Sequence, residues 1–214
     1  MHIPSKFKEK DLNTLCQLIE DYPLGTLITT EQGELDACHI PFYINRPESR
    51  KMTLQSHIAR ANSIWRDCQD GQKILLIFYG PNAYISPNFY PSKEVTGKAV
   101  PTWNYSVVHV RGRLYFKHSS EWILQLLENI SDLQESASQE VPWSVADAPA
   151  VFISKLINAV VGLEVEIDDM IGNFKLSQNK DEHDYNGVLN GLKKSNREHE
   201  RAVHHQMRNR VTHD

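Results

Sequence analysis

The sequence predicts a mainly β fold: a barrel or sandwich of antiparallel strands with flanking helices. Short segments rich in β-branched residues alternate with turn residues through the first half of the chain, as in such folds. No strand–helix unit opens with a glycine-rich turn, so a Rossmann nucleotide site is not expected. The length of 214 residues suits one large domain, or one domain with an added element.

The expected strands begin after a short helix at residues 9–20. Residues 24–30 and 35–44 flank a polar turn containing Gly33 and predict a hairpin. The apolar run at residues 74–78 predicts a strand buried on both faces. Further strands are expected at residues 51–56, 83–86 and 105–116. The polar connection at residues 87–99 is long for a compact domain, and such loops are often functional.

Two helices and a further strand follow. Residues 119–133 carry an apolar stripe, and Ser119 is placed to cap the helix. Asp147 is placed to cap the second helix, with Pro149 in its first turn. Its expected buried face consists of Phe152, Ile153, Leu156, Ile157 and Val160. Alternation at residues 163–168 predicts a half-exposed strand, and Gly172-Asn173 predicts a turn after it.

The composition changes beyond residue 180. We therefore predict a domain at residues 1–179, with inserted helices near 119–160, and a helical, locally basic tail at residues 180–214. Basic side chains outnumber acidic ones in residues 193–210: Lys193, Lys194, Arg197, Arg201, Arg208 and Arg210 against Glu198 and Glu200. This segment is expected to form an exposed helix.

Charge and cysteine usage restrict the class of protein. The formal net charge of −4 and the pI near 6.2 give no support to a general nucleic-acid binder. Cys16, Cys38 and Cys68 form no CxxC pair and suit a reducing cytosol, where they are expected to be buried small hydrophobes. No apolar stretch approaches the roughly 20 residues that cross a bilayer. A cytoplasmic protein without a membrane segment is expected.

Three polar clusters are candidates for a binding site. In the first, His57 and Arg60 are spaced to approach one anion, and the arginine fork suits phosphate; the alternative is a surface turn with an ordinary salt bridge. The second mixes polar side chains with aromatic ones that are able to enclose a planar ring: Tyr84, Phe89, Tyr90, Trp103 and Tyr105. The alternative is an aromatic mini-core under a loop.

The third cluster, residues 175–179, follows the last strand, and its alternative is a solvated strand end. Signatures of common enzyme classes are absent: the sequence contains no HExxH, P-loop or GxSxG motif. His199 and His204 are five residues apart and do not share a helix face well, and with His205 they form no closed set of ligands. No metal site is expected.

At these clusters the sequence closely resembles the PaiB-type FMN-binding negative transcriptional regulators, over roughly residues 1–192. The matching motifs are Met1-His2-Ile3-Pro4 with Phe7, residues 22–29, His39-Ile40-Pro41, residues 57–62 with Trp65, residues 78–87, Tyr90-Pro91-Ser92-Lys93, residues 100–105, Val108-His109, Val161-Gly162 with Glu164, and residues 175–179. Ser63 and Asn173 depart from the family pattern, as do residues 131–135.

The resemblance implies an FMN-binding split β-barrel, an antiparallel Greek-key-like barrel, with FMN at the interface of a homodimer. By this resemblance the phosphate or ribityl chain is held by Ser56, His57 and Arg60, supported by Asn62. The flavin ring is lined by Trp103, Asn104 and Tyr105. Lys175, Ser177, Gln178 and Asn179 reach the flavin of the partner subunit.

The family implies a transcriptional regulator, but the sequence shows no convincing helix-turn-helix with a basic recognition helix. A weak contact between DNA and the basic tail is one expectation, and a solvated helix end is the alternative. A flavin-dependent oxidoreductase that uses NAD(P)H is a second hypothesis, with His57, His109 and Tyr105 as candidate acids or bases. A third is that the same cleft binds haem or another planar ligand.

Overall fold

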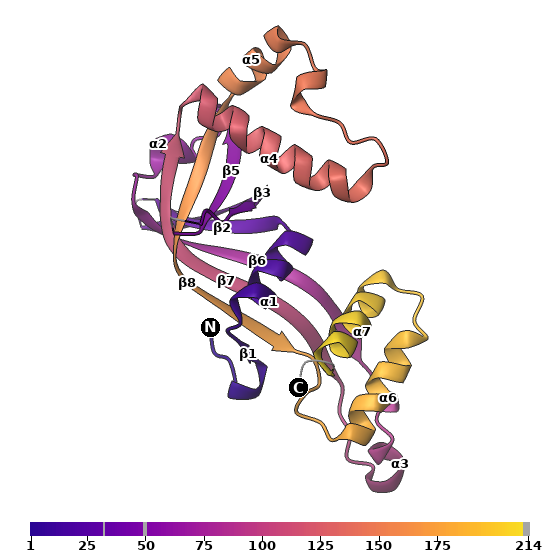
Figure 1. Ribbon diagram of the computed structural model, residues 1–214. Coiled ribbons are helices and arrows are strands. Elements are labelled where there is room, and N and C mark those ends of the chain that lie inside the picture. Colours follow the sequence, from indigo (N-terminus) through magenta and orange to yellow (C-terminus); the bar gives the residue numbers. More distant parts are fainter. Residues whose placement is uncertain (32, 49–50, 212–214) are drawn as a thin grey trace. The chain divides into compact units, whose positions relative to one another are not determined.

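The computed structural model describes residues 1–31, 33–48 and 51–211 (Figure 1). These residues form two compact units. Unit 1 comprises Met1–Leu18, Tyr79–Val108 and the described part of Ile171–Asp214, and unit 2 comprises Ile19–Phe78 and His109–Met170. Three long strands contribute residues to both units: β6 (Gln72–Ile85), β7 (Thr102–Lys117) and β8 (Val160–Lys175).

Unit 2 contains most of the strands. With β2 (Leu24–Glu31), β3 (Glu34–Pro41), β4 (Tyr43–Asn45) and β5 (Thr53–Ala59), the order of neighbours is β3-β2-β6-β7-β8-β5-β4. β2 and β3 pair antiparallel with Leu24 opposite Pro41, which confirms the predicted hairpin. β5 pairs antiparallel with β8 and places His57 opposite Gly162. The mainly β, antiparallel prediction is confirmed.

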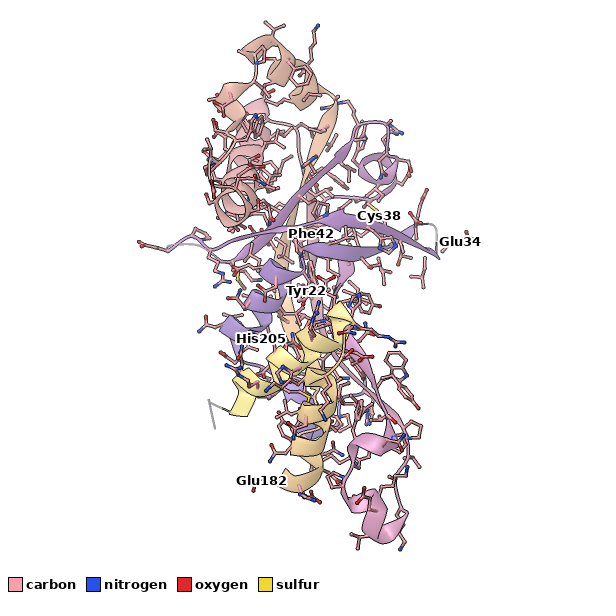
Figure 2. The ribbon with its side chains drawn as sticks, turned by 90° about the vertical axis from the view of Figure 1, so that its right-hand side faces the viewer. Tyr22, Glu34, Cys38, Phe42, Glu182 and His205 are labelled. Atoms are coloured by element: carbon pink, nitrogen blue, oxygen red, sulfur yellow. The ribbon has the colours of Figure 1, made fainter. Side chains whose placement is uncertain are left out.

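The core of unit 2 lies between these strands and the helices that cover them. Phe42 and Phe78 pack edge to face with ring centroids 5.9 Å apart (Figure 2 labels Phe42). The predicted double burial of residues 74–78 is wrong for one face, because Ile74, Leu76 and Phe78 are buried whereas Leu75 and Ile77 are only partly covered. This strand and the predicted one at 83–86 form the single strand β6.

The helices of unit 2 are α2 (Ile64–Asp67), α4 (Ser120–Ser138), the 3-10 turn η3 (Val145–Asp147) and α5 (Ala150–Asn158). Ser119 Oγ accepts from Trp122 N at 3.3 Å, which confirms the predicted cap. Asp147 does not cap α5; its carboxylate accepts from Ser144 N at 2.8 Å and closes η3. The predicted buried face of α5 is also wrong, because Phe152 and Leu156 are 54% and 46% exposed.

Unit 1 begins with η1 (Ser5–Phe7), β1 (Lys8–Glu9) and the first residues of α1 (Leu12–Asp21). β1 pairs antiparallel with β8, Lys8 opposite Asn173. The turn predicted at Gly172-Asn173 is therefore wrong: β8 continues through it. A Cβ at Gly172 would lie 2.6 Å from Leu15 Cδ2, so this glycine permits close packing rather than a turn.

Besides the ends of β6, β7 and β8, unit 1 contains η2 (Pro87–Phe89), α3 (Ser92–Thr96), α6 (Glu182–Lys193, Glu182 labelled in Figure 2) and α7 (Glu198–Val211). α6 and α7 lie side by side (Figure 1), and Tyr185 donates its hydroxyl to Met207 O at 2.8 Å. The prediction of an exposed helix is wrong for one face of α7, where Val203 and Met207 are 0% exposed. Periodicity in this polar segment is too sparse to reveal that face.

Among the described residues, no helix combines the length and the apolar composition that crossing a bilayer requires. Within the described residues the cysteines form no disulfide; Cys16 and Cys68 are buried as predicted, whereas Cys38 is only partly buried. Burial raises the pKa of the Cys38 and Cys68 thiols, so both stay protonated near neutral pH.

Candidate functional site

In unit 1 the predicted ring-binding residues are divided between the two faces of a sheet. Side chains alternate along β7, so Trp103 and Tyr105 point to one face and Asn104 to the other. Trp103 is 54% exposed, and its ring packs edge to face with Tyr84 of β6, with centroids 5.9 Å apart and planes at 73°. We call Tyr84, Trp103 and Tyr105 with Lys175 the aromatic face.

Lys175 is the charged member of the aromatic face. Its ammonium donates to Trp103 O at 2.6 Å and to Thr102 Oγ1, so its position is fixed against the main chain of β7. Burial, together with the charge of Lys180, lowers the pKa of this ammonium. Next to it on β8, Asn173 donates through Nδ2 to Tyr105 Oη at 3.1 Å. Asn173 Oδ1 is buried and has no partner among the described residues.

Asn104 and Ser177 lie on the other face of the sheet, beneath α7. Asn104 Nδ2 donates to Ser177 Oγ at 2.8 Å, and Ser177 Oγ is 3.2 Å from Asn104 Oδ1. Both residues are almost completely buried, at 0% and 2% exposure, and Met207 Sδ lies 3.6 Å from Asn104 Nδ2. Ser177 has a φ of 63°, an unusual conformation for a residue other than glycine. The pair therefore secures the turn that ends β8.

Gln178 and Asn179 complete the third cluster. Gln178 folds back on the strand end: its Oε1 accepts from Leu176 N at 2.7 Å and its Nε2 donates to Phe174 O at 2.5 Å. These bonds stabilise the same turn. Asn179 is exposed on the surface of this turn. The four predicted residues of this cluster are therefore separated: Lys175 lies on the aromatic face, Ser177 lies beneath α7, and Gln178 and Asn179 belong to the turn.

The predicted phosphate residues lie in unit 2, where β5 ends and α2 begins. Arg60 donates from Nε to Asn158 O and from Nη2 to Val160 O, each at 2.8 Å, and Nη1 makes no hydrogen bond to the described residues. Asn62 Oδ1 accepts from Ile64 N at 3.0 Å at the start of α2. Ser56 is fully buried and donates to Pro41 O at 2.6 Å. Ser56 and Asn62 thus hold the segment, and Arg60 supplies its charge.

His57 lies on β5 opposite Gly162, at the face that α4 covers: a Cβ at Gly162 would lie 2.3 Å from Trp122 Cζ3. Burial lowers the pKa of His57 below the ordinary value of 6.5. The imidazole is therefore neutral at physiological pH. Its Nδ1 is buried and has no partner among the described residues. His57 can exchange a hydrogen bond with a ligand but adds no positive charge.

His57 also makes stability depend on pH. Protonation of His57 is harder in the folded than in the unfolded chain. The neutral imidazole therefore keeps its full contribution to the free energy of unfolding above about pH 6.5, and this contribution is lost as the pH falls below that value. Burial acts in the same direction on His109 and His204. We expect a lower free energy of unfolding at about pH 5 than at about pH 7, and a smaller drop in His57→Gln. Urea titrations at both pH values measure this; an equal drop in the variant would contradict it.

A second polar network lies beside this segment on the same strands. Glu164 of β8 accepts from Gln55 Nε2 at 2.9 Å and from Lys117 Nζ at 2.8 Å. Burial by itself would raise the pKa of Glu164, but these hydrogen bonds and the charge of Lys117 hold it below its usual range. Glu164 therefore stays ionised, and its charge is neutralised by Lys117 rather than directed at a ligand.

Each unit by itself carries groups that suit one part of FMN. The isoalloxazine ring needs a flat apolar surface with donors at its carbonyl edge, and the phosphate needs a cation with hydrogen-bonding capacity. The exposed Tyr84–Trp103 pair and the Lys175 ammonium meet the first need within unit 1. The free Nη1 of Arg60 meets the second within unit 2, and the unpartnered His57 Nδ1 adds a hydrogen-bonding group there.

Two features of these surfaces depend on strand pairing and are not visible in the sequence. Tyr84 was one of the candidate aromatics, but its contact with Trp103 depends on the pairing of β6 with β7. Lys117 and Glu164 meet only because β7 and β8 are neighbours. Within residues 1–31, 33–48 and 51–211, no group of three or more histidine, cysteine or acidic side chains is arranged to hold a metal ion.

Comparison with known structures shows the fold. A flavocytochrome, Anf3, from Azotobacter vinelandii has a TM-score of 0.57 and 16% identity, covering 86% of this chain and 78% of its own. An FAD and heme binding protein from Mycobacterium smegmatis has a TM-score of 0.56 and 13% identity, covering 79% and 73%. At these identities the likeness establishes the architecture, a sheet of the split-barrel type.

Sequence comparison shows the family. Residues 1–169 match the family described as "Putative FMN-binding domain". Protease synthase and sporulation protein PAI 2 of Bacillus subtilis is 31% identical over 192 residues, which are 90% of this chain and 89% of that protein. An uncharacterized protein of Emericella nidulans, AN0679, is 31% identical in an alignment that covers 90% of this chain and 90% of that protein. The chain therefore belongs to the FMN-binding domain family with PAI 2, as its motifs indicated, and its cofactor is FMN.

Proposed function

We propose that Arg60 and His57 of unit 2 bind the FMN phosphate, and that the protein is an FMN-dependent transcriptional regulator of the PaiB type. The observation that carries the phosphate assignment is the fixed guanidinium of Arg60. Two main-chain carbonyls hold its Nε and Nη2, which leaves Nη1 oriented without a competing acidic partner among the described residues. A pre-positioned arginine loses little side-chain entropy when an anion binds.

Replacing Arg60 tests this assignment. Arg60→Ala is expected to weaken FMN binding by roughly ten- to hundredfold, because a charge-assisted hydrogen bond contributes about 1.5–3 kcal/mol. Riboflavin lacks the phosphate, so its affinity is expected to stay within about twofold. Titrations followed by flavin fluorescence measure both ligands.

The matched control is Arg66→Ala. Arg66 is exposed, and its guanidinium lies over the Trp65 ring at 5.0 Å. It should leave FMN affinity unchanged. Equal losses for FMN and riboflavin in Arg60→Ala would indicate damage to the fold and would remove Arg60 from the phosphate site.

The regulatory role rests on the family and on the charge of unit 1. Lys193, Lys194, Arg201 and Arg208 are exposed on α6 and α7 or between them, while Arg210 pairs with Glu9 at 3.0 Å. Exposed cations of this kind suit contacts to DNA phosphates. Binding to duplex DNA should then fall steeply with added salt in an anisotropy titration. Affinity that stays the same at high salt would contradict a contact through these residues.

A flavin-dependent oxidoreductase is the second candidate. The exposed aromatic face favours it, since a ring bound there would stay accessible to a reductant or acceptor from solvent. The two structural relatives named above are a flavocytochrome and an FAD and heme binding protein. Oxidation of NADH or NADPH by the FMN-loaded protein with an added acceptor would support this activity. Haem binding is a further possibility for the same face, and the haem absorption band tests it.

We also propose that the protein is a cytoplasmic homodimer. Apolar side chains are exposed along α4 and α5 and the segment between them, in unit 2: Leu133, Val141, Trp143, Val151, Phe152 and Leu156. A surface of this kind is typical of a protein contact, and a second copy of the chain is the occupant we propose. Sedimentation at micromolar concentration tests the dimer. The lack of disulfides among the described cysteines supports a reducing compartment.

A further inference from the structure

We infer that Tyr84 binds the flavin ring together with Trp103, as the second wall of a corner on the aromatic face of unit 1. This inference rests on the proposed FMN-binding function and names a residue of unit 1 for the flavin ring. Tyr84 and Trp103 come from adjacent strands, β6 and β7, and are 44% and 54% exposed. Two large aromatic side chains that stay exposed side by side are more typical of a ligand surface than of a core.

The relative orientation of the two rings suits a flat ligand. Their planes meet at 73° with centroids 5.9 Å apart, so one ring presents its edge to the face of the other. A planar heterocycle stacked on one ring then meets the second ring side-on. Both offset-stacked and edge-to-face contacts are favourable between aromatic systems. A pair of parallel rings, already stacked on each other, would leave less surface for the flavin.

Lys175 gives this corner its polarity. The ammonium has three N–H donors, and Trp103 O and Thr102 Oγ1 accept from it, which leaves one donor available. The carbonyl edge of the flavin ring carries the acceptors that such a donor matches. The site is thus chemically specific: an apolar corner for the ring beside one cation for its oxygen-bearing edge.

The same geometry excludes two residues from direct contact. Asn104 and Ser177 lie on the opposite face of the sheet, hydrogen-bonded to each other and covered by α7. A ring stacked on Trp103 cannot reach them across the sheet. Tyr84 shares a face of the sheet with Trp103 and can contact the flavin ring, whereas Asn104 points to the opposite face and cannot.

Lumiflavin, the flavin ring without ribityl chain or phosphate, is the probe that isolates this corner. In Tyr84→Ala we expect lumiflavin, riboflavin and FMN all to bind roughly three- to tenfold more weakly, the effect of losing one aromatic contact. Tyr84→Phe keeps the ring and should stay within about twofold of the wild type. The matched control is Tyr79→Ala, since Tyr79 is 61% exposed on the same strand.

The outcomes separate the two claims. If the wild type binds FMN and Tyr84→Ala binds all three ligands equally well, the inference is overturned while the FMN function stands. If Tyr84→Ala changes the oligomeric state in sedimentation and leaves ligand affinity intact, the aromatic face is a protein contact and the inference is again overturned. If the wild type binds none of the ligands, the proposed function itself fails. Parallel losses in Tyr84→Ala and in Tyr79→Ala would also overturn the assignment.

Discussion

Deleting residues 195–214 is expected to destabilise unit 1 by more than any single substitution considered above. The inner face of α7 buries Val203 and Met207 completely. Each contributes about 1.5–3 kcal/mol through burial, against a total stability of about 5–15 kcal/mol for a typical domain. The deletion also removes the Met207 contact of Asn104, the residue that is hydrogen-bonded to Ser177 at the turn after β8.

Point variants locate the effect within α7. Met207→Ala is expected to lower the free energy of unfolding by about 2–5 kcal/mol, as for other fully buried side chains. Gln206→Ala should cost about 1 kcal/mol, since Ser106 Oγ loses the acceptor it contacts at 2.6 Å. Arg208→Ala, on the exposed side of the same helix, is the control and should change little. Urea unfolding followed by circular dichroism measures all three; a fully stable deletion would contradict the packing of α7.

The local features of the fold were predictable where a pattern is local. The β2–β3 hairpin and the Ser119 cap depend on neighbouring residues, and both predictions are confirmed. The errors arise where a distant segment decides. Gly172-Asn173 is typical of a turn by local rules, yet Leu15 packs on Gly172 and β1 pairs with Asn173, so β8 runs straight through.

The candidate site shows the same division. The family resemblance implied that Trp103, Asn104 and Tyr105 all line the flavin ring, but consecutive residues of a strand point to opposite faces. Which face is covered depends on α7, whose polar sequence gives no sign of burial. Phe152 and Leu156 show the converse: their spacing predicts a buried face, but they stay 54% and 46% exposed among the described residues. Apolar periodicity predicts that a helix face will be buried, but it does not identify whether the same chain or a partner buries it.

Gly187→Ala is expected to destabilise the protein, against the usual direction for this substitution. In a helix interior alanine normally stabilises by about 1 kcal/mol relative to glycine. Gly187 and Gly191 of α6, however, face η2: a Cβ at Gly187 would lie 2.1 Å from Phe89 O and 2.6 Å from Pro91 Cδ. The first of these atoms is main chain and cannot rotate away. We expect a net loss of about 1–3 kcal/mol, the range for overpacked cores.

The contact also holds the loop that carries Tyr90-Pro91-Ser92-Lys93. Asp184 of α6 accepts from Ser92 N at 3.1 Å and from Ser92 Oγ at 2.8 Å, at the first residue of α3. A helix displaced by the new methyl group would strain these bonds as well. Asn186→Ala, one position earlier and exposed, is the control, and there alanine should be neutral or slightly stabilising. Urea unfolding of both variants tests this prediction. A Gly187→Ala protein at least as stable as the wild type would show that the loop does not require a residue without a Cβ at this position of α6.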